Sequence, residues 1–113
     1  MNSTILRIYM PVKARGKGKL SIFQKLFSSS LVGYLLKEAK AFGTEQSIFQ
    51  RVFGGYLKDR KLVFDQAEIA PPDLPQCVEL IDQETKLRSF VEKYRDQLEG
   101  CRVVLFKTAE LLS

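Results

Sequence analysis

The spacing of hydrophobic residues changes several times along the chain, and each change marks a predicted element. Thr4–Val12 alternates, with Leu6, Ile8 and Met10 on one face, which is the periodicity of a β-strand. From Leu20 to Phe42 apolar residues recur at three- and four-residue steps, which predicts an amphipathic helix.

Glycine and serine punctuate this first half of the chain. Ser28–Ser30 and Gly33 are weak helix formers, so the predicted helix can bend or break there. Gly43 stands where glycine commonly ends a helix.

The second half repeats the strand–helix alternation. Ser47–Phe53 and Gln76–Ile81 are predicted strands, and residues 54–75 between them form a long excursion with an extra edge strand around Leu62–Phe64. Asp82 is the predicted N-cap of a helix over Gln83–Leu98. The apolar run Arg102–Phe106 is then typical of a strand buried on both faces.

The order β-α-β-β-α-β is that of a ferredoxin-like α+β fold, with a four-stranded antiparallel sheet and two helices on one face. The 113 residues fit one domain, 1–113, with a mobile loop at about 54–75. Apolar residues on both faces of several strands predict that the open sheet face meets another subunit. Cys77 begins the third predicted strand, and Cys101 lies just before the fourth. We take these two strands as antiparallel, which predicts thiols at opposite ends of the sheet and no internal disulfide.

Composition narrows the class of protein. The chain carries 18 Lys and Arg against 13 Asp and Glu, and its first 30 residues contain no acid. This excess of positive charge suits an anionic partner, and solvated loops that keep the protein soluble are the alternative. No apolar run is long enough to span a bilayer, and no secretory signal is recognisable. With only two cysteines, we expect reduced thiols and a cytoplasmic location.

Catalytic chemistry is not indicated. The chain has no histidine, which removes the commonest general base and the commonest metal ligand. Carboxylate pairs occur at a helix start and on a helix face, where capping and solvation explain them. We therefore expect neither an enzyme nor a metal site.

Two glycine-containing loops are candidates for anion binding. Gly16, Lys17, Gly18 and Lys19 precede a predicted helix start, where free amides and lysines suit a phosphate, although the Walker spacing is missing. A mobile connector is the alternative. Arg51, Gly54 and Gly55 end a strand and allow close ligand approach, or else mark a bulge or turn.

Basic and aromatic residues interleave after the second strand. Phe49, Phe53 and Tyr56 alternate with Arg51 and Lys58, as on RNA-recognition sheets of the same strand order. The third strand reads QCVELI, without the aromatic signature of those modules, so nucleic acid is not the expected partner.

Several collinear motifs resemble the PII-like family of bacterial and archaeal proteins. They are LRIY at Leu6–Tyr9, the loop GKGKL, RVFGGY after the second strand, and DLPQCVELIDQETKL at Asp73–Leu87. The resemblance covers nearly the whole chain. It implies a homotrimer related to nitrogen-regulatory PII proteins, which bind adenine nucleotides and sometimes an organic acid between subunits. Their mobile loop after the second strand clamps onto transporters, channels, enzymes or transcription factors.

The sequence departs from the PII pattern in two places. The tyrosine-bearing modification loop is not found, and IAPPDLP stands where a glycine-rich nucleotide loop follows in PII proteins. Nucleotide binding therefore depends on the local basic and glycine residues.

The leading hypothesis is a trimeric, non-enzymatic PII-like regulator. It binds a small anion of the ATP, ADP or AMP type at subunit clefts through Gly16, Lys17, Gly18, Lys19, Arg51, Gly54 and Gly55. A partner protein is contacted by the loop residues Tyr56, Lys58, Arg60 and Lys61. The alternatives are a trimer like the CutA-type metal-tolerance proteins, and a single-stranded nucleic-acid-binding module.

Overall fold

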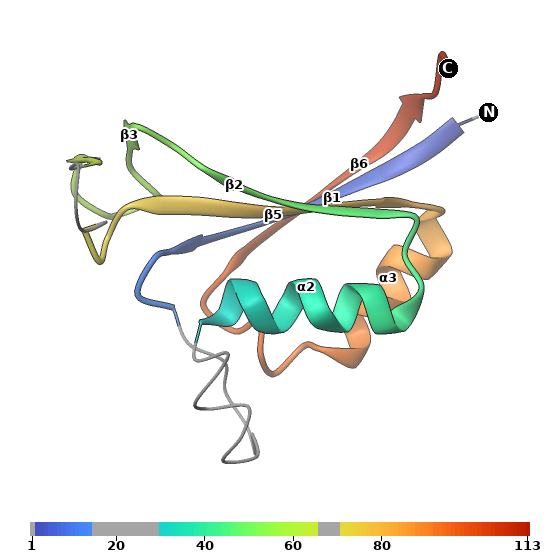
Figure 1. Cartoon of the computed structure of the whole chain (residues 1–113), viewed down its shortest axis with the longest axis horizontal. Helices are drawn as coiled ribbons and strands as arrows, with labels where there is room; N and C mark the ends of the chain where they lie inside the picture. Colours follow the sequence, from blue (N-terminus) through green and yellow to red (C-terminus); the bar gives the residue numbers. More distant parts are fainter. Residues whose placement is uncertain (1, 15–29, 66–70) are drawn as a thin grey trace.

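A four-stranded antiparallel sheet forms the framework of the computed structural model, which describes residues 2–14, 30–65 and 71–113. The main elements are β1 (Asn2–Pro11), α2 (Leu31–Phe42), β2 (Gln46–Arg51), β5 (Pro75–Asp82), α3 (Glu84–Lys93) and β6 (Arg102–Glu110). The strands lie side by side in the order β2-β5-β1-β6. Both helices lie on the same side of this sheet (Figure 1). The predicted α+β, ferredoxin-like arrangement is therefore confirmed.

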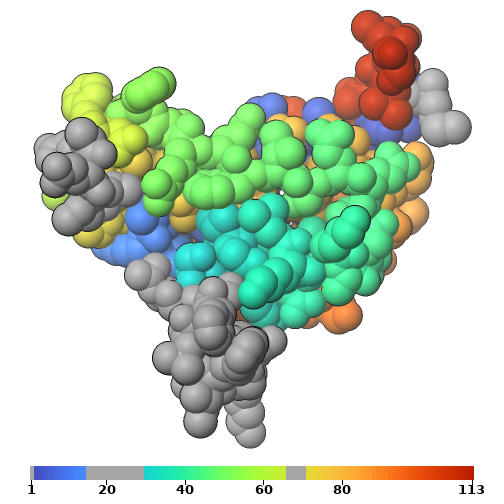
Figure 2. All heavy atoms as spheres, in the orientation of Figure 1, coloured from blue at the N-terminus to red at the C-terminus, as the bar shows by residue number. Residues whose placement is uncertain are grey.

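The hydrophobic core lies between the sheet and the two helices. Leu6, Ile8 and Met10 point from β1 toward the helices and are almost fully buried, as the alternation predicts. Leu35 of α2 and Phe90 of α3 pack against them, and neither side chain is exposed to solvent. Figure 2 shows α2 packed directly beneath β2.

The helix α2 begins at a serine cap and not at Leu20. Ser30 has extended backbone angles (φ −84°, ψ 143°), and its Oγ accepts a hydrogen bond from the Gly33 amide at 3.1 Å. The helix predicted over Leu20–Phe42 is therefore interrupted at Ser30, within the serine triplet where the sequence predicts a bend or break. Residues 20–29 lie outside the described part of the chain. Gly43 ends the helix with φ 86°, a left-handed conformation that glycine adopts without a steric penalty.

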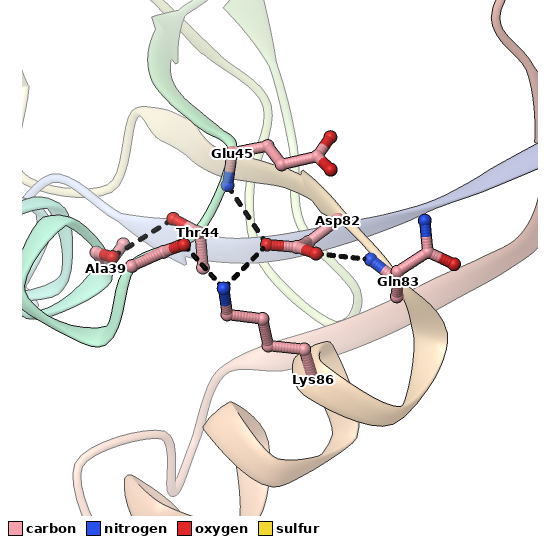
Figure 3. Close-up of polar contacts among 7 residues, drawn as sticks. Ala39, Thr44, Glu45, Asp82, Gln83 and Lys86 are labelled. Atoms are coloured by element: carbon pink, nitrogen blue, oxygen red, sulfur yellow. Dashed lines mark hydrogen bonds and ion pairs between the residues drawn. The ribbon is translucent and has the colours of Figure 1, made fainter.

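Asp82 is not the N-cap of α3, as the sequence had suggested. It is the last residue of β5, and Gln83 occupies the cap position. The Asp82 carboxylate instead accepts hydrogen bonds from the amides of Glu45 at 3.0 Å and Gln83 at 2.6 Å (Figure 3). Lys86 Nζ lies 3.4 Å from the same carboxylate and donates to the Gly43 carbonyl oxygen at 2.6 Å. We call this set of contacts the Asp82 cluster.

The end of α3 and the burial of β6 also differ from prediction. The helix ends at Lys93 and the chain continues to Gly100 in turns, although Leu98 still packs into the core. The strand β6 pairs only with β1, so it is an edge strand, and its residues are exposed or half-buried. Burial on both faces is therefore wrong for Arg102–Phe106 within one subunit.

The two cysteines lie at the same end of the sheet, which corrects the predicted placement. Because β5 and β6 each pair antiparallel with β1, they run parallel to each other. Tyr9 is opposite Cys77 on one side and Arg102 on the other. The strand β1 still separates the thiols by roughly 10 Å, which is beyond disulfide reach. Neither Cys77 nor Cys101 forms a disulfide, and burial raises the pKa of the Cys77 thiol.

The extra strand of the excursion pairs within a small ribbon and not with the main sheet. β3 (Gly54–Gly55) and β4 (Val63–Phe64) form a separate two-stranded antiparallel sheet. This ribbon extends from the end of the sheet where β2 ends and β5 begins (Figure 1). No helix among the described residues is long and apolar enough to cross a membrane.

Candidate functional site

Four separate segments meet at the end of the sheet that carries the ribbon. The register opposes Arg51 to Gln76 and Pro11 to Pro75, so β2 and β1 end where β5 begins. Because β6 begins opposite Tyr9, the turn between α3 and β6 reaches the same end. The excursion after β2 therefore lies close to three other parts of the chain.

Gly54 allows the ribbon to close. A Cβ atom at this position would lie 2.5 Å from Cδ1 of Phe64, which no side chain can occupy unless the phenyl ring moves. The amide of Asp65 donates to the Phe53 carbonyl oxygen at 2.6 Å, which closes the ribbon beyond this contact. The structure thus gives Gly54 a packing role, and its predicted role in ligand contact stays a prediction.

Between the two ribbon strands the chain turns sharply, and we call Leu57–Lys61 the tip. The amide of Arg60 donates to the Leu57 carbonyl oxygen at 3.0 Å, and Asp59 has a φ of 63°. Aspartate tolerates this left-handed conformation better than most residues. The turn places Lys58 and Arg60 beside the start of β6.

The tip and the start of β6 enclose a small basic pocket of about 270 Å³. Its lining residues are Tyr9, Pro11, Leu57, Lys58, Asp59, Arg60, Gly100, Cys101 and Arg102. Three cationic side chains therefore face one carboxylate. Lys58 and Arg102 form no ion pair with any other described residue, so the pocket carries excess positive charge. Such a pocket favours an anion.

The hollows along the groove between α3 and β6 are larger but do not share this charge excess. They measure about 460 and 470 Å³. The arginines that line them are neutralised locally, Arg88 by Glu84 at 2.8 Å and Arg95 by Glu92. Charge, and not size, distinguishes the basic pocket.

A carboxylate beside the pocket collects cations from two segments. Asp73 Oδ1 lies 2.9 Å from Lys13 Nζ and 3.3 Å from Arg60 Nη1, and Asp73 Oδ2 lies 3.8 Å from Lys61 Nζ. The hydrogen bond from Lys13, with the nearby charges of Lys61 and Arg60, lowers the pKa of the Asp73 carboxyl. Asp73 thereby ties the tip to the chain just after β1.

None of the described residues of the predicted ligand site, Arg51, Gly54 and Gly55, lines this pocket. Gly16, Lys17, Gly18 and Lys19 lie outside the described residues. The Arg51 guanidinium stacks over the Phe49 ring at 5.8 Å and does not line the pocket. Lys58 and Arg60, predicted to bind a partner protein, line it instead. Lys61 binds Asp73.

Sequence reasoning missed Arg102 and Asp73. The sequence predicts Arg102 only as the first residue of a buried strand. Its position beside the tip follows from the pairing of β6 with β1, which opposes Arg102 to Tyr9. The local signal was a charged residue immediately after Gly100 and Cys101, at the point where a turn becomes a strand. Asp73 gave no signal beyond its place in a proline-rich segment.

Large aromatic side chains are exposed on and beside the ribbon. Phe53 is 90% exposed, Tyr56 68% and Phe64 64%. Exposed apolar groups gathered on one feature commonly mark a contact surface. Tyr56 and Phe64 lie within the loop at about 54–75 that is predicted to bind a partner, and Phe53 directly precedes it.

The sheet face opposite the helices forms a second candidate surface. The outward residues include Ile5, Ile48 and Phe106 around a central ion pair between Arg7 Nε and Glu79 Oε2 at 2.8 Å. The hydrogen bond to Glu79 raises the pKa of the Arg7 guanidinium, which also lies 5.0 Å from the Phe106 ring centre. This face is apolar at its periphery and charge-paired at its centre.

The described residues offer little for catalysis. They contain no group of three or more histidine, cysteine or acidic side chains that could hold a metal ion. Tyr94 has a pKa raised to about 12 by burial and by its hydrogen bond to Glu38 at 3.1 Å, but it packs in the core.

Comparison with known proteins places the chain among relatives. The sequence matches the DUF190 family, described as Uncharacterized ACR, over residues 3–110. A UPF0166 protein of Aquifex aeolicus strain VF5 is 33% identical over 67 residues, which cover 59% of this chain and 64% of that protein. The match thus spans just under two thirds of this curated relative.

Two solved structures align with the chain over most of its length. One is CPII, a nitrogen regulatory PII-like protein from Thiomonas intermedia K12 bound to ADP, AMP and bicarbonate. It aligns with a TM-score of 0.54 and 11% identity over 94% of this chain and 83% of CPII. An EthD-like protein from Ralstonia eutropha JMP134 aligns with a TM-score of 0.45 and 8% identity, over 94% of this chain and 91% of that protein.

Proposed function

This chain belongs to the DUF190 family and has a PII-like fold, and from this premise we propose that it is a non-enzymatic signalling protein. In this proposal it binds a small anionic ligand and passes the occupancy of its site to a partner protein. The observation that carries the proposal is the basic pocket formed by Lys58, Arg60 and Arg102.

The ligand we propose carries phosphate groups. The related fold of CPII was solved with ADP, AMP and bicarbonate, all of which are anions. At about 270 Å³ the basic pocket is below the usual range for a whole organic ligand but has room for a phosphate or diphosphate group. An adenine nucleotide would then need a second surface for its base, and a neighbouring subunit would supply one.

We propose a homotrimer assembled through the open sheet face. A single subunit leaves Ile48 38% and Phe106 42% exposed beside half-buried Ile5 and Ile81. The Arg7–Glu79 ion pair neutralises the charges that the described residues place at the centre of this face, so a second copy would bury apolar groups there without an unpaired charge. We propose that such an interface also brings one subunit's pocket close to its neighbour.

The ribbon is the proposed contact with a regulated transporter, channel or enzyme. Its exposed aromatics, Phe53, Tyr56 and Phe64, supply apolar area, and Lys61 supplies charge at the adjoining tip. Within residues 54–75, we propose that the ribbon and its tip are the mobile part and that their order depends on the ligand, a common form of switch. We propose the cytoplasm as the compartment, because cysteines that form no disulfide are typical of reducing compartments.

Calorimetric titration of the purified protein tests this proposal. The probes are pyrophosphate, AMP, ADP, ATP and bicarbonate, and the variants are Arg102→Gln in the pocket and Arg88→Gln on the exposed face of α3. Each variant removes one positive charge from an arginine. We expect saturable binding of at least one phosphate compound, weakened about tenfold by Arg102→Gln, because a charge-assisted contact contributes about 1.5 kcal/mol.

Two results would contradict the proposal. If no probe binds saturably, the pocket is not an anion site. If Arg88→Gln weakens binding as much as Arg102→Gln does, the effect reflects overall charge and not contact in the pocket.

A further inference from the structure

Arg60 takes part in two arrangements at once. Its side chain lines the basic pocket, and its Nη1 atom lies 3.3 Å from Asp73 Oδ1. The other two cations that contact Asp73 are Lys13 and Lys61, and neither lines the pocket. Among residues 2–14, 30–65 and 71–113, Arg60 is therefore the side chain through which Asp73 and an anion in the pocket can influence each other directly.

Asp73 is held in place by its own backbone surroundings. The amide of Lys13 donates to the Pro72 carbonyl oxygen at 2.9 Å, and the amide of Leu74 donates to the Pro71 carbonyl oxygen at 3.0 Å. Leu74 is also fully buried. The carboxylate thus projects from a fixed segment, whereas Arg60 is an exposed side chain on the tip and has freedom to reorient.

We propose that Asp73 is an intramolecular competitor of the anionic ligand for Arg60. When the pocket is empty, Arg60 pairs with Asp73 and ties the tip to the chain after β1. When an anion enters the pocket, Arg60 turns toward it, the pair with Asp73 is lost, and the longer Lys61–Asp73 contact of 3.8 Å is left to hold the tip there. This inference rests on the proposed function, because it assigns regulation to the same pocket.

The effect of Asp73 on anion affinity should be modest, because Asp73 and Arg60 form an exposed ion pair. Exposed ion pairs contribute up to about 1 kcal/mol, which is a factor of about five in affinity, so removing the Asp73 charge should tighten anion binding about two- to fivefold. The gain should shrink as salt concentration rises, because both the ion pair and the bound anion are screened.

The test is a titration of pyrophosphate into the full chain and into a set of variants. Asp73→Asn removes the proposed competitor with little change in shape. Asp65→Asn is the matched control, because it makes the same charge change in the same excursion, at a carboxylate that forms no ion pair with any described residue. We expect Asp73→Asn to bind pyrophosphate two- to fivefold more tightly and Asp65→Asn to bind like the wild type.

A double-mutant cycle separates competition from a general charge effect. In an Arg60→Gln background, binding should be weaker overall and Asp73→Asn should give no further gain, since the shared side chain is gone. If Asp73→Asn leaves affinity unchanged or weakens it, Asp73 positions Arg60 for the ligand and the inference is wrong. An equal gain with and without Arg60 also overturns it.

The outcomes distinguish this inference from the proposed function. A wild-type protein that binds no phosphate compound overturns both. A wild-type protein that binds pyrophosphate, together with an Asp73→Asn variant that binds no more tightly, overturns the competition alone and leaves the pocket as an anion site.

Discussion

Replacing Asp82 with alanine should destabilise the protein by about 2–4 kcal/mol without changing its affinity for an anion. The Asp82 side chain is 4% exposed and accepts hydrogen bonds from the amides of Glu45 and Gln83. Charge-assisted hydrogen bonds of this kind contribute about 1.5–3 kcal/mol each. Both donors are near the surface, so water can replace part of what is lost, which reduces the summed effect to about 2–4 kcal/mol.

Lys86 should matter less than Asp82. Its side chain is 39% exposed, and it retains its hydrogen bond to the Gly43 carbonyl oxygen when the carboxylate is removed. We therefore expect Lys86→Met to cost about 1 kcal/mol, and the double variant to cost less than the sum of the two single changes. That coupling would show that the Asp82 cluster acts as a unit.

Urea unfolding followed by circular dichroism measures these differences. With an unfolding entropy of about 2.1 cal/mol/K per residue over 113 residues, the Asp82→Ala loss corresponds to a fall of roughly 8–17 °C in Tm at fixed protein concentration. Asp96→Ala, an exposed carboxylate without an ion pair in the described structure, is the control and should leave stability nearly unchanged. Equal stability of Asp82→Ala and Asp96→Ala would refute this account.

The affinity expectation follows from position. Asp82 is opposite Thr4 at one end of the sheet, whereas Pro75, opposite Pro11, begins β5 at the end that carries the basic pocket. Seven steps along a strand separate the two ends by about 24 Å. Changes so far apart are normally additive. A changed pyrophosphate affinity in folded Asp82→Ala would therefore show that the sheet couples its two ends.

Three further predictions concern the core, pH and assembly. Phe90→Ala should cost about 3–5 kcal/mol in urea unfolding, because the ring is fully buried between the sheet and the helices; a loss below 1 kcal/mol would contradict this packing. The pKa of Tyr94 is about 12 in the folded protein against 10.0 ordinarily, so its stabilisation is complete below pH 10 and is lost as pH rises from 10 through 12. Tyr94→Phe should flatten that part of the stability profile in urea unfolding, and an unchanged slope would refute the assignment. Light scattering should give a trimer for the wild type and for Lys37→Glu, which changes an exposed residue of α2, and a smaller species for Ile48→Glu on the open sheet face. A trimeric Ile48→Glu variant would exclude that face as the interface.

Local patterns were enough to predict the framework of the fold. Alternation placed Leu6, Ile8 and Met10 on the buried face of β1, because a strand with one covered face leaves a period of two in its sequence. Gly43 was recognised as a helix end, because a left-handed residue is needed there whatever the tertiary structure. These features depend on neighbours only a few residues away.

The errors fall where distant residues decide. An aspartate between a strand and a helix can cap the helix or end the strand, and the amide of Glu45, 37 residues away in the sequence, determines which occurs at Asp82. Arg102–Phe106 has the composition of a buried strand, but its place at the sheet edge follows from its pairing with β1 alone. Its apolar residues on the open face are consistent with the proposed subunit contact.

The basic pocket was missed for the same reason, since its cations come from segments more than 40 residues apart. Lys58 and Arg60 were visible as a basic cluster, but only the register that opposes Arg102 to Tyr9 places a third cation beside them.

The connection between the pocket and the ribbon gives the proposed signalling a physical route. The tip lies between β3 and β4 in the sequence, and those strands pair Gly54 with Phe64. A movement of Arg60 toward a ligand would therefore change the backbone conformation in the few residues between the tip and Val63. Val63 is buried and Phe64 is exposed. A shift of the backbone there would therefore move the Phe64 side chain more easily than the packed Val63 side chain. The aromatic surface proposed to contact a partner thus lies within a few residues of the side chain proposed to sense the ligand.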